Sequence, residues 1–235
     1  MKNALIPYVI ENEGQNERSY DLYSRLLKDR IIMIQGEVDN PTMNIAVGEL
    51  LFLNNQDNEK PIFIYINSPG GDVQSGLQLI NTMKYIKAPV YTISMGLAAS
   101  MGAAILSAGE PGHRYALKDS SILVHRMSSG VSGTNEDNVV NLNYQKRLNN
   151  ILLAEVGHNC KHISDEAYEE ITSVMQELDD DRNENMKMKF SKKTQKELET
   201  FKKGASGYDH WMFPKAALKF GIIDKILTSE DDLSE

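Results

Sequence analysis

The chain has 235 residues, of which 41% are hydrophobic, and its formal net charge is −8. This length and apolar content suit one globular domain with a sizeable core. The negative charge argues against a nucleic-acid-binding protein, because such proteins need a basic face. No run of residues approaches the roughly 18 consecutive apolar positions of a membrane-spanning helix.

The N-terminal sequence and the cysteine content predict a cytoplasmic location. The residues after Lys2, ALIPYVIE, become acidic too soon for a signal peptide, so we expect no export. Cys160 is the only cysteine and cannot form an internal disulfide, which is typical of a protein in a reducing compartment.

Strands and helices are predicted to alternate along the first half of the chain. Residues 1–20 are polar and are expected to form an irregular, flexible segment, and RSYDLYSRLLKDR after them has the spacing of a short helix. Such alternation indicates an α/β fold with a parallel sheet. The predicted strands are Ile31–Val38, Pro61–Pro69, Pro89–Ser94 and strand material within Arg114–Arg126, and the predicted helices are Met43–Gln56, Gly76–Lys87 and Ala99–Gly109.

The second half of the chain has a different character. A Gly/Ser loop, Ser128–Asp137, precedes a predicted long helix, Asn138–Gly157. Apolar residues fall on more than one face of this helix, which fits either a core helix or a helix that contacts another subunit. Residues 177–203 are dense in charge and are predicted to be a solvated helical insertion. A short helix and a final strand complete the domain at residue 228, and the acidic tail, Ser229–Glu235, is expected to be disordered.

Two loops follow predicted strands, which is where active sites lie in open α/β sheets. In the first loop, Gly70 and Gly71 allow backbone N–H groups to turn toward a ligand, although the same pair also fits a plain tight turn. In the second loop, Ser100 is surrounded by small residues at the predicted start of a helix. Ser100 therefore fits either a helix cap or a catalytic nucleophile.

A histidine favours the catalytic interpretation of Ser100. His125 ends a predicted strand, and a nearby imidazole can accept the proton of a serine hydroxyl near neutral pH. Together with the Gly-Gly turn, the two residues predict an acyl-transfer site. The other histidines lie in loops or charged segments without a comparable setting: His113, His158, His162 and His210.

These motifs resemble the ClpP family, the serine-peptidase subunits of the Clp protease. LIPYVIE, YINSPGGDV, MGLAASMGA and GIIDKIL occur in the family's order, and the resemblance covers most of residues 4–157 and resumes at about 208–228. It implies an α/β spiral of ββα units similar to the crotonase fold, with a handle helix between two stacked heptameric rings. It further implies that Ser100 is the nucleophile, that His125 is the general base, and that the N–H groups of Gly71 and Met101 form the oxyanion hole.

The resemblance also implies the partners of the chain. We expect a homo-oligomer, a tetradecamer, that hydrolyses unfolded proteins delivered by an AAA+ Clp unfoldase. That unfoldase uses ATP, and the present chain contains no P-loop, so we expect no cofactor and no metal in the chain itself. No nucleic acid and no membrane are expected as partners.

Several positions depart from the family pattern. Arg126 and Met127 follow His125 where the family has Gln-Pro, and the long helix is about one turn shorter. The family's catalytic aspartate aligns with Ala205, so we expect the nearest acid, Asp209, to complete the triad. Trp211 is expected to hold that loop in the core.

Three alternatives remain open at this point. The site can be a Ser–His dyad, or the chain can be a catalytically impaired, structural subunit of a mixed ring. A crotonase-type acyl-CoA enzyme is the third, although that class relies on carboxylates and oxyanion-hole amides rather than on a nucleophilic serine.

Overall fold

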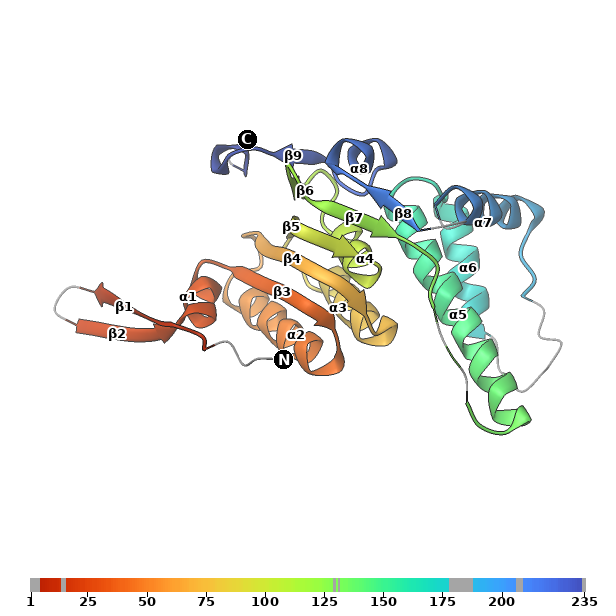
Figure 1. Cartoon of the computed structure of the whole chain (residues 1–235), viewed down its shortest axis with the longest axis horizontal. Coiled ribbons are helices and arrows are strands. Elements are labelled where there is room, and N and C mark those ends of the chain that lie inside the picture. The colour runs from red at the N-terminus through yellow and green to blue at the C-terminus, as the bar shows by residue number, and fades with distance from the viewer. Residues whose placement is uncertain are drawn as a thin grey trace.

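A seven-stranded sheet forms the centre of the computed structural model, which describes residues 5–13, 16–128, 130, 132–177, 188–205 and 209–233 (Figure 1). Five strands run parallel in the order β3-β4-β5-β6-β9, and the predicted α/β class is confirmed. β7 pairs in parallel with the C-terminal end of β5, and β8 pairs antiparallel with β7. The strands are β3 (Ile31–Val38), β4 (Ile62–Gly71), β5 (Val90–Ala99), β6 (Arg114–Leu117), β7 (Ser121–Val124), β8 (His210–Met212) and β9 (Lys225–Leu227).

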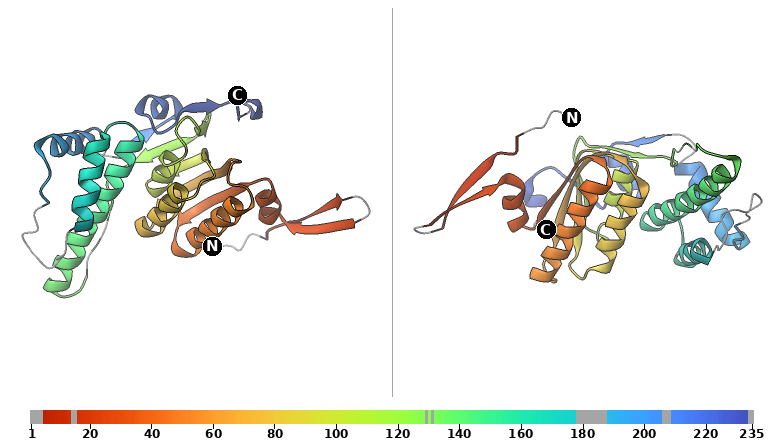
Figure 2. Two further views of the ribbon diagram at one scale, coloured as in Figure 1. Left: turned by 180° about the vertical axis from the view of Figure 1, so that it is seen from behind. Right: turned by 90° about the horizontal axis from the view of Figure 1, so that it is seen from below.

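Three helices lie on one side of this sheet: α2 (Asn40–Gln56), α3 (Val73–Tyr85) and α4 (Met101–Ser107) (Figure 2). Alternate residues of β4 are fully buried, as the period of a pleated strand requires. Burial of these apolar side chains is the main contribution to the stability of the fold. The core between sheet and helices includes Ile32, Ile34, Ile62, Ile64, Ile66, Met43, Leu50, Leu53, Leu79 and Ile80.

The N-terminal segment differs from the irregular chain that its composition suggested. β1 (Tyr8–Glu13) and β2 (Asn16–Asp21) form an antiparallel hairpin that projects from the body of the molecule (Figure 1). The predicted short helix follows as α1 (Leu22–Lys28), with Asp21 as its N-cap. The Glu11 carboxylate accepts hydrogen bonds from Arg25 and Lys28 of α1, so charge pairs connect the hairpin to the helix.

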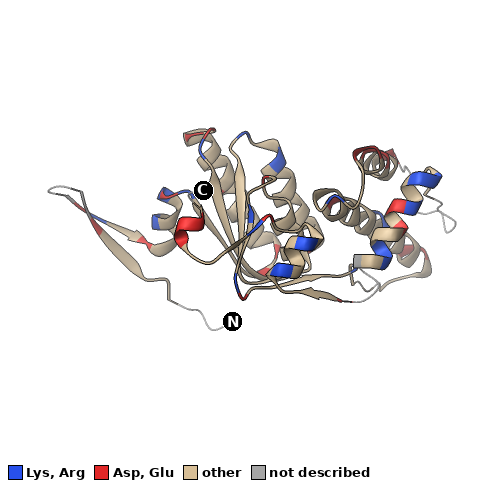
Figure 3. Cartoon of the chain, turned by 90° about the horizontal axis from the view of Figure 1, so that it is seen from above, with Lys and Arg blue, Asp and Glu red and all other residues tan. Residues whose placement is uncertain are grey.

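Three helices form a second group at the far end of the sheet: α5 (Asn135–Asn159), α6 (Asp165–Glu177) and α7 (Lys192–Ala205) (Figure 1). Lysines and glutamates are interspersed along α7, whereas α6 carries Asp and Glu but no Lys or Arg (Figure 3). α7 nevertheless buries Leu198 and Phe201, each 3% exposed, which lie on one face of the helix. The prediction of a merely solvated insertion is therefore wrong for α7, and residues 178–187 lie outside the described residues.

The long helix α5 is a core helix in one half and has apolar side chains available for another subunit in the other half. Its C-terminal half is a core helix, in which Leu152, Leu153 and Val156 are buried. Its N-terminal half exposes 44% of Leu142 and 37% of Tyr144. Only the N-terminal half of α5 therefore has apolar side chains that a partner subunit could cover.

The C-terminal residues complete the fold, and their structure differs from the disorder expected of an acidic tail. α8 (Pro214–Phe220) precedes β9, and a 3-10 helix, η1 (Glu230–Leu233), follows it. Leu233 packs against a small cluster of Ile93, Tyr115 and Leu227, and Lys225 Nζ donates to the Asp232 carbonyl at 2.8 Å. The acidic tail is therefore ordered over these residues, since an apolar contact and hydrogen bonds compensate for its charge.

A buried ion pair joins β6 to the segment before β9. The Arg114 side chain is 6% exposed, and its guanidinium donates from Nε and Nη2 to the two carboxylate oxygens of Asp224, at 2.8 and 2.6 Å. Burial raises the pKa of Asp224, but the hydrogen bonds and the charge of Arg114 outweigh it and leave that pKa below its ordinary value. Within the described ranges, no helix is both long and apolar enough to cross a membrane.

Replacing Asp224 by Asn should lower the free energy of unfolding by about 3 kcal/mol, because a buried guanidinium loses its counter-charge. The lowered pKa of Asp224 gives stability that is present above its unfolded-state pKa and lost as the pH falls through its folded-state pKa. Urea unfolding at pH 7 and in strong acid measures both effects. A stability difference between wild type and D224N that persists unchanged in acid would contradict the assignment.

Candidate active site

Ser100 occupies the sharp turn between β5 and α4. Its backbone has φ 55° and ψ −120°, a conformation that residues other than glycine seldom adopt and that costs on the order of 1–3 kcal/mol. The turn is held by three backbone hydrogen bonds: Ser100 N–H donates to Leu123, and Ala103 and Ala104 donate to the Ser100 carbonyl. The hydroxyl makes no capping hydrogen bond to α4, so the helix-cap interpretation does not account for this serine.

The end of β4 packs directly on this turn. A Cβ atom at Gly70 would lie 2.6 Å from Ser100 Cβ, 2.7 Å from the Ala99 carbonyl oxygen and 2.9 Å from Met101 N. Gly70 also has φ +92°, so both its conformation and its neighbours require a residue without a side chain. The close approach brings the Gly-Gly turn at the end of β4 to the Ser100 turn that follows β5.

The N–H groups of Gly71 and Met101 are the ones expected in the oxyanion hole. Gly71 lines the same cavity as Ser100. Met101 is the first residue of α4, and the first N–H groups of a helix have no intrahelical acceptor. The Met101 side chain is fully buried against Gly76, which fixes the start of the helix.

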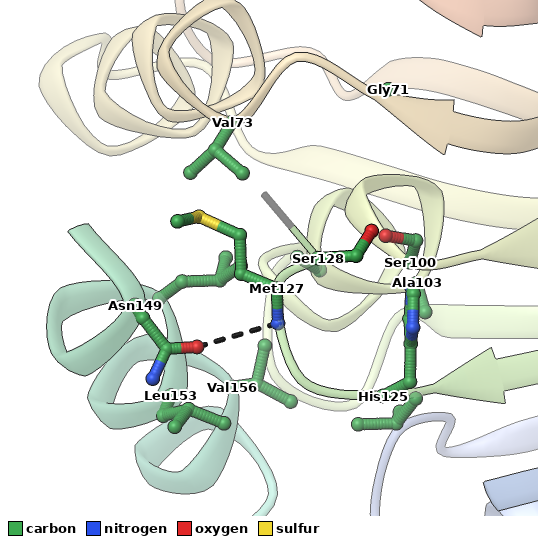
Figure 4. A pocket seen from close by; sticks show the side chains of 13 residues that line it. Gly71, Val73, Ser100, Ala103, His125, Met127, Ser128, Asn149, Leu153 and Val156 are labelled. Carbon is green, nitrogen blue, oxygen red and sulfur yellow. Dashed lines mark hydrogen bonds between the residues drawn. The ribbon is translucent and has the colours of Figure 1, made fainter. Parts of the chain in front are cut away.

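The order of the strands places His125 beside Ser100. β7 pairs in parallel with the end of β5, with Leu123 opposite Ala99, so the residues that follow the two strands emerge side by side. Ser100 and His125 line one cavity (Figure 4). No hydrogen bond joins the two side chains in the described structure, and in ligand-free enzymes such bonds often tighten only when substrate binds.

Asp209 lies opposite His125 by strand register. In the antiparallel pair of β7 and β8, Val124 faces His210, so the next position of each strand places His125 against Asp209. His125 Nδ1 and Asp209 Oδ1 are 3.8 Å apart, which is within ion-pair range but longer than a hydrogen bond. The Asp209 side chain is 67% exposed, which leaves it free to move closer.

Trp211 and Ala205 are the two other residues that bear on which acid faces His125. Trp211 is 59% exposed and does not anchor the loop in the core, because the pleat of β8 turns Met212 inward instead, at 3% exposure. Ala205 is the last residue of α7 and carries no carboxylate. The acid closest to His125 in the described residues is therefore Asp209.

The cavity beside Ser100 is small and mostly apolar, with a volume of about 70 Å³. Val73 of α3, Ala104 of α4 and Leu152, Leu153 and Val156 of α5 supply apolar walls. No Asp or Glu is among the described residues that line it, which disfavours the carboxylate chemistry of crotonase-type enzymes.

Two further lining residues were not anticipated from the sequence. Met127 N–H donates to Asn149 Oδ1 at 3.3 Å, and both side chains face the cavity (Figure 4). Only the position of Met127 two residues after His125 hints at this role, and Asn149 has no distinguishing signal within its helix.

The other four histidines have packing partners away from this cavity. His113 stacks on Tyr91 at 3.9 Å between ring centroids. His158 stacks on Tyr168 and bonds to the Asp165 carboxylate at 2.9 Å. The remaining two lie against Phe220, and one of them belongs to strand β8 rather than to a loop: His162 and His210.

Comparison with protein families identifies the family of the chain. A family model described as Clp protease matches residues 14–177 and 158–230. The two matched ranges together cover most of the chain and contain Ser100, His125 and Asp209.

Substituting Gly70 by Ala should destabilise the fold by at least about 2 kcal/mol more than the same change at Gly112. The two glycines have nearly equal φ values, +92° and +90°, but a Cβ at Gly112 would meet nothing within 4 Å. The comparison therefore isolates the contact with Ser100 from the backbone strain. Urea unfolding of both variants measures the difference. Equal losses of unfolding free energy would show that Gly70 does not lie close to Ser100.

Proposed function

Since the chain belongs to the Clp protease family, we propose that it is a serine endopeptidase subunit that hydrolyses peptide bonds of unfolded proteins. The observation that carries this proposal is the convergence of Ser100, His125 and Asp209 at one edge of the sheet, beside Gly71. The strained backbone at Ser100 supports it, because such strain is common at catalytic residues.

The proposed reaction proceeds through an acyl-enzyme. Ser100 Oγ attacks the peptide carbonyl carbon while His125 takes its proton, and the developing oxyanion accepts hydrogen bonds from the N–H groups of Gly71 and Met101. The C–N bond then breaks, and His125 gives the proton to the departing amine. Water, deprotonated by His125, hydrolyses the ester, and Asp209 orients and stabilises the imidazolium in both steps.

The cavity supplies the subsite for the residue before the scissile bond. Ser100 lines it, and its walls are mainly apolar. A peptide in extended conformation would place one side chain in this cavity while its carbonyl carbon lies at Ser100 Oγ.

We further propose that the chain assembles into stacked heptameric rings and receives unfolded protein from an AAA+ unfoldase that consumes the ATP. Large apolar side chains exposed on α2, α3 and α5 support an assembly, because these helices contact one another and apolar surface that continues across neighbouring helices is typical of interaction sites. They include Ile45 and Phe52 of α2, Tyr85 of α3, and Leu142 and Tyr144 of α5.

A catalytically impaired subunit is the second candidate, and the alanine at position 205 favours it. In that case the chain would contribute to a mixed ring without cleaving peptides. The carboxylate of Asp209 near His125 argues for the active alternative.

Replacing Ser100 by Ala should abolish hydrolysis of a short fluorogenic peptide, with a loss of about 10⁴- to 10⁶-fold in kcat, because no other group can form the acyl-enzyme. Light scattering should show unchanged assembly. Wild type, but not S100A, should react with a fluorophosphonate. Wild-type rates in S100A would rule out the proposed nucleophile.

Replacing Asp209 by Asn should lower kcat by about 10⁴-fold, because the imidazole loses the acid that holds its tautomer. The matched control is Asp165→Asn, which removes an acid beside a different histidine, His158, and should leave kcat unchanged. Ala205→Asp should also have little effect. Full activity in D209N would indicate a Ser–His dyad, and an inactive wild type activated by A205D would indicate an impaired subunit.

A further inference from the structure

One wall of the cavity belongs to a loop rather than to a helix or strand. Met127 lies two residues after His125, and its thioether extends from the loop toward Val73 of α3 (Figure 4). The other walls belong to α3, α4, α5 and the strand ends, all of which are packed into the main core. Met127 is therefore a wall that the main core does not hold in place.

A hydrogen bond ties this loop to α5. The N–H of Met127 donates to Asn149 Oδ1 at 3.3 Å, and Asn149 is half-buried on the helix face that lines the cavity. Only one residue separates Met127 from His125, so the same bond restrains the loop that carries the proposed base. Proline at position 127 could not make it, because proline has no backbone N–H.

We propose that Met127 determines which side chain the cavity accepts, and that Asn149 is a positioning residue that holds Met127 in place. The inference rests on the proposed function, in which a peptide bond is cleaved at Ser100. It assigns aliphatic side chains, rather than aromatic ones, to the residue before the scissile bond.

The assignment of aliphatic side chains depends on the size of the cavity. Its volume of about 70 Å³ is roughly half of the 150 Å³ that accommodates a benzene ring in an apolar protein cavity. An aromatic side chain therefore enters only if a wall moves. Methionine is unbranched and has three rotatable side-chain bonds, so it adapts to aliphatic groups of different shape while it still blocks an aromatic ring.

The test uses full-length chain and two fluorogenic peptides that differ only in Leu or Phe before the scissile bond. Wild type should prefer Leu in kcat/KM by about tenfold or more. Met127→Ala should open the cavity and lower this Leu/Phe ratio by about tenfold. The matched control, Met127→Leu, conserves the volume and should keep the ratio within about twofold.

Asn149→Ala tests the positioning role. It should lower the Leu/Phe ratio in the same direction as Met127→Ala, and the double variant should show no further change, because both act on one wall. A merely structural role of Asn149 would instead lower both rates equally and leave the ratio unchanged.

An unchanged ratio in an active Met127→Ala variant would overturn the inference and leave the proposed function intact. If Met127→Ala fails to fold, Met127→Val shortens the same side chain and answers the same question. A wild-type chain that cleaves neither peptide and whose Ser100 does not react with a fluorophosphonate would overturn the proposed function, and this inference with it.

Discussion

The contact between the ends of β4 and β5 is the constraint on which the rest of the site depends. Gly70 approaches Ser100 so closely that no side chain fits between them, and this closeness holds the serine turn in its unfavourable conformation. The parallel order of the strands creates the contact, because it brings the carboxyl ends of β4, β5 and β7 to one edge. The hydroxyl, the imidazole and the candidate oxyanion donors thus all belong to residues within two positions of a strand end.

The part of the fold that follows from local pattern could be predicted from the sequence. Ile31–Val38 begins with four apolar residues and is a strand with the predicted bounds, in which buried Ile32 and Ile34 alternate with half-buried neighbours. The juxtaposition of Ser100, His125 and Gly71 was also predictable, because each lies at or directly after the carboxyl end of a strand of a parallel sheet. Their catalytic roles rest on the proposed function.

The features that the sequence did not reveal depend on long-range pairing or on short elements. β8 has three residues, too few for a periodic signal, yet its register with β7 decides that Asp209 faces His125 and that Trp211 faces solvent. β2 and the second half of β1 are polar, so their backbone pairing leaves no alternating apolar pattern to detect. The bond between Met127 and Asn149 joins a loop to a helix and has no local signature at all.

The pairing of β7 with β8 has a consequence for the order in which the chain matures. Ser100 directly follows β5 and His125 directly follows β7, and only α4 and β6 separate these strands, whereas Asp209 precedes β8, which comes after all of α5, α6 and α7. Contacts between residues so distant in sequence form late in folding, because the loop they close carries a large entropic cost. A nascent or truncated chain therefore has its serine and histidine before it has the acid. In the proposed mechanism the site is therefore incomplete until β8 has paired with β7, which delays peptide hydrolysis until the chain has folded.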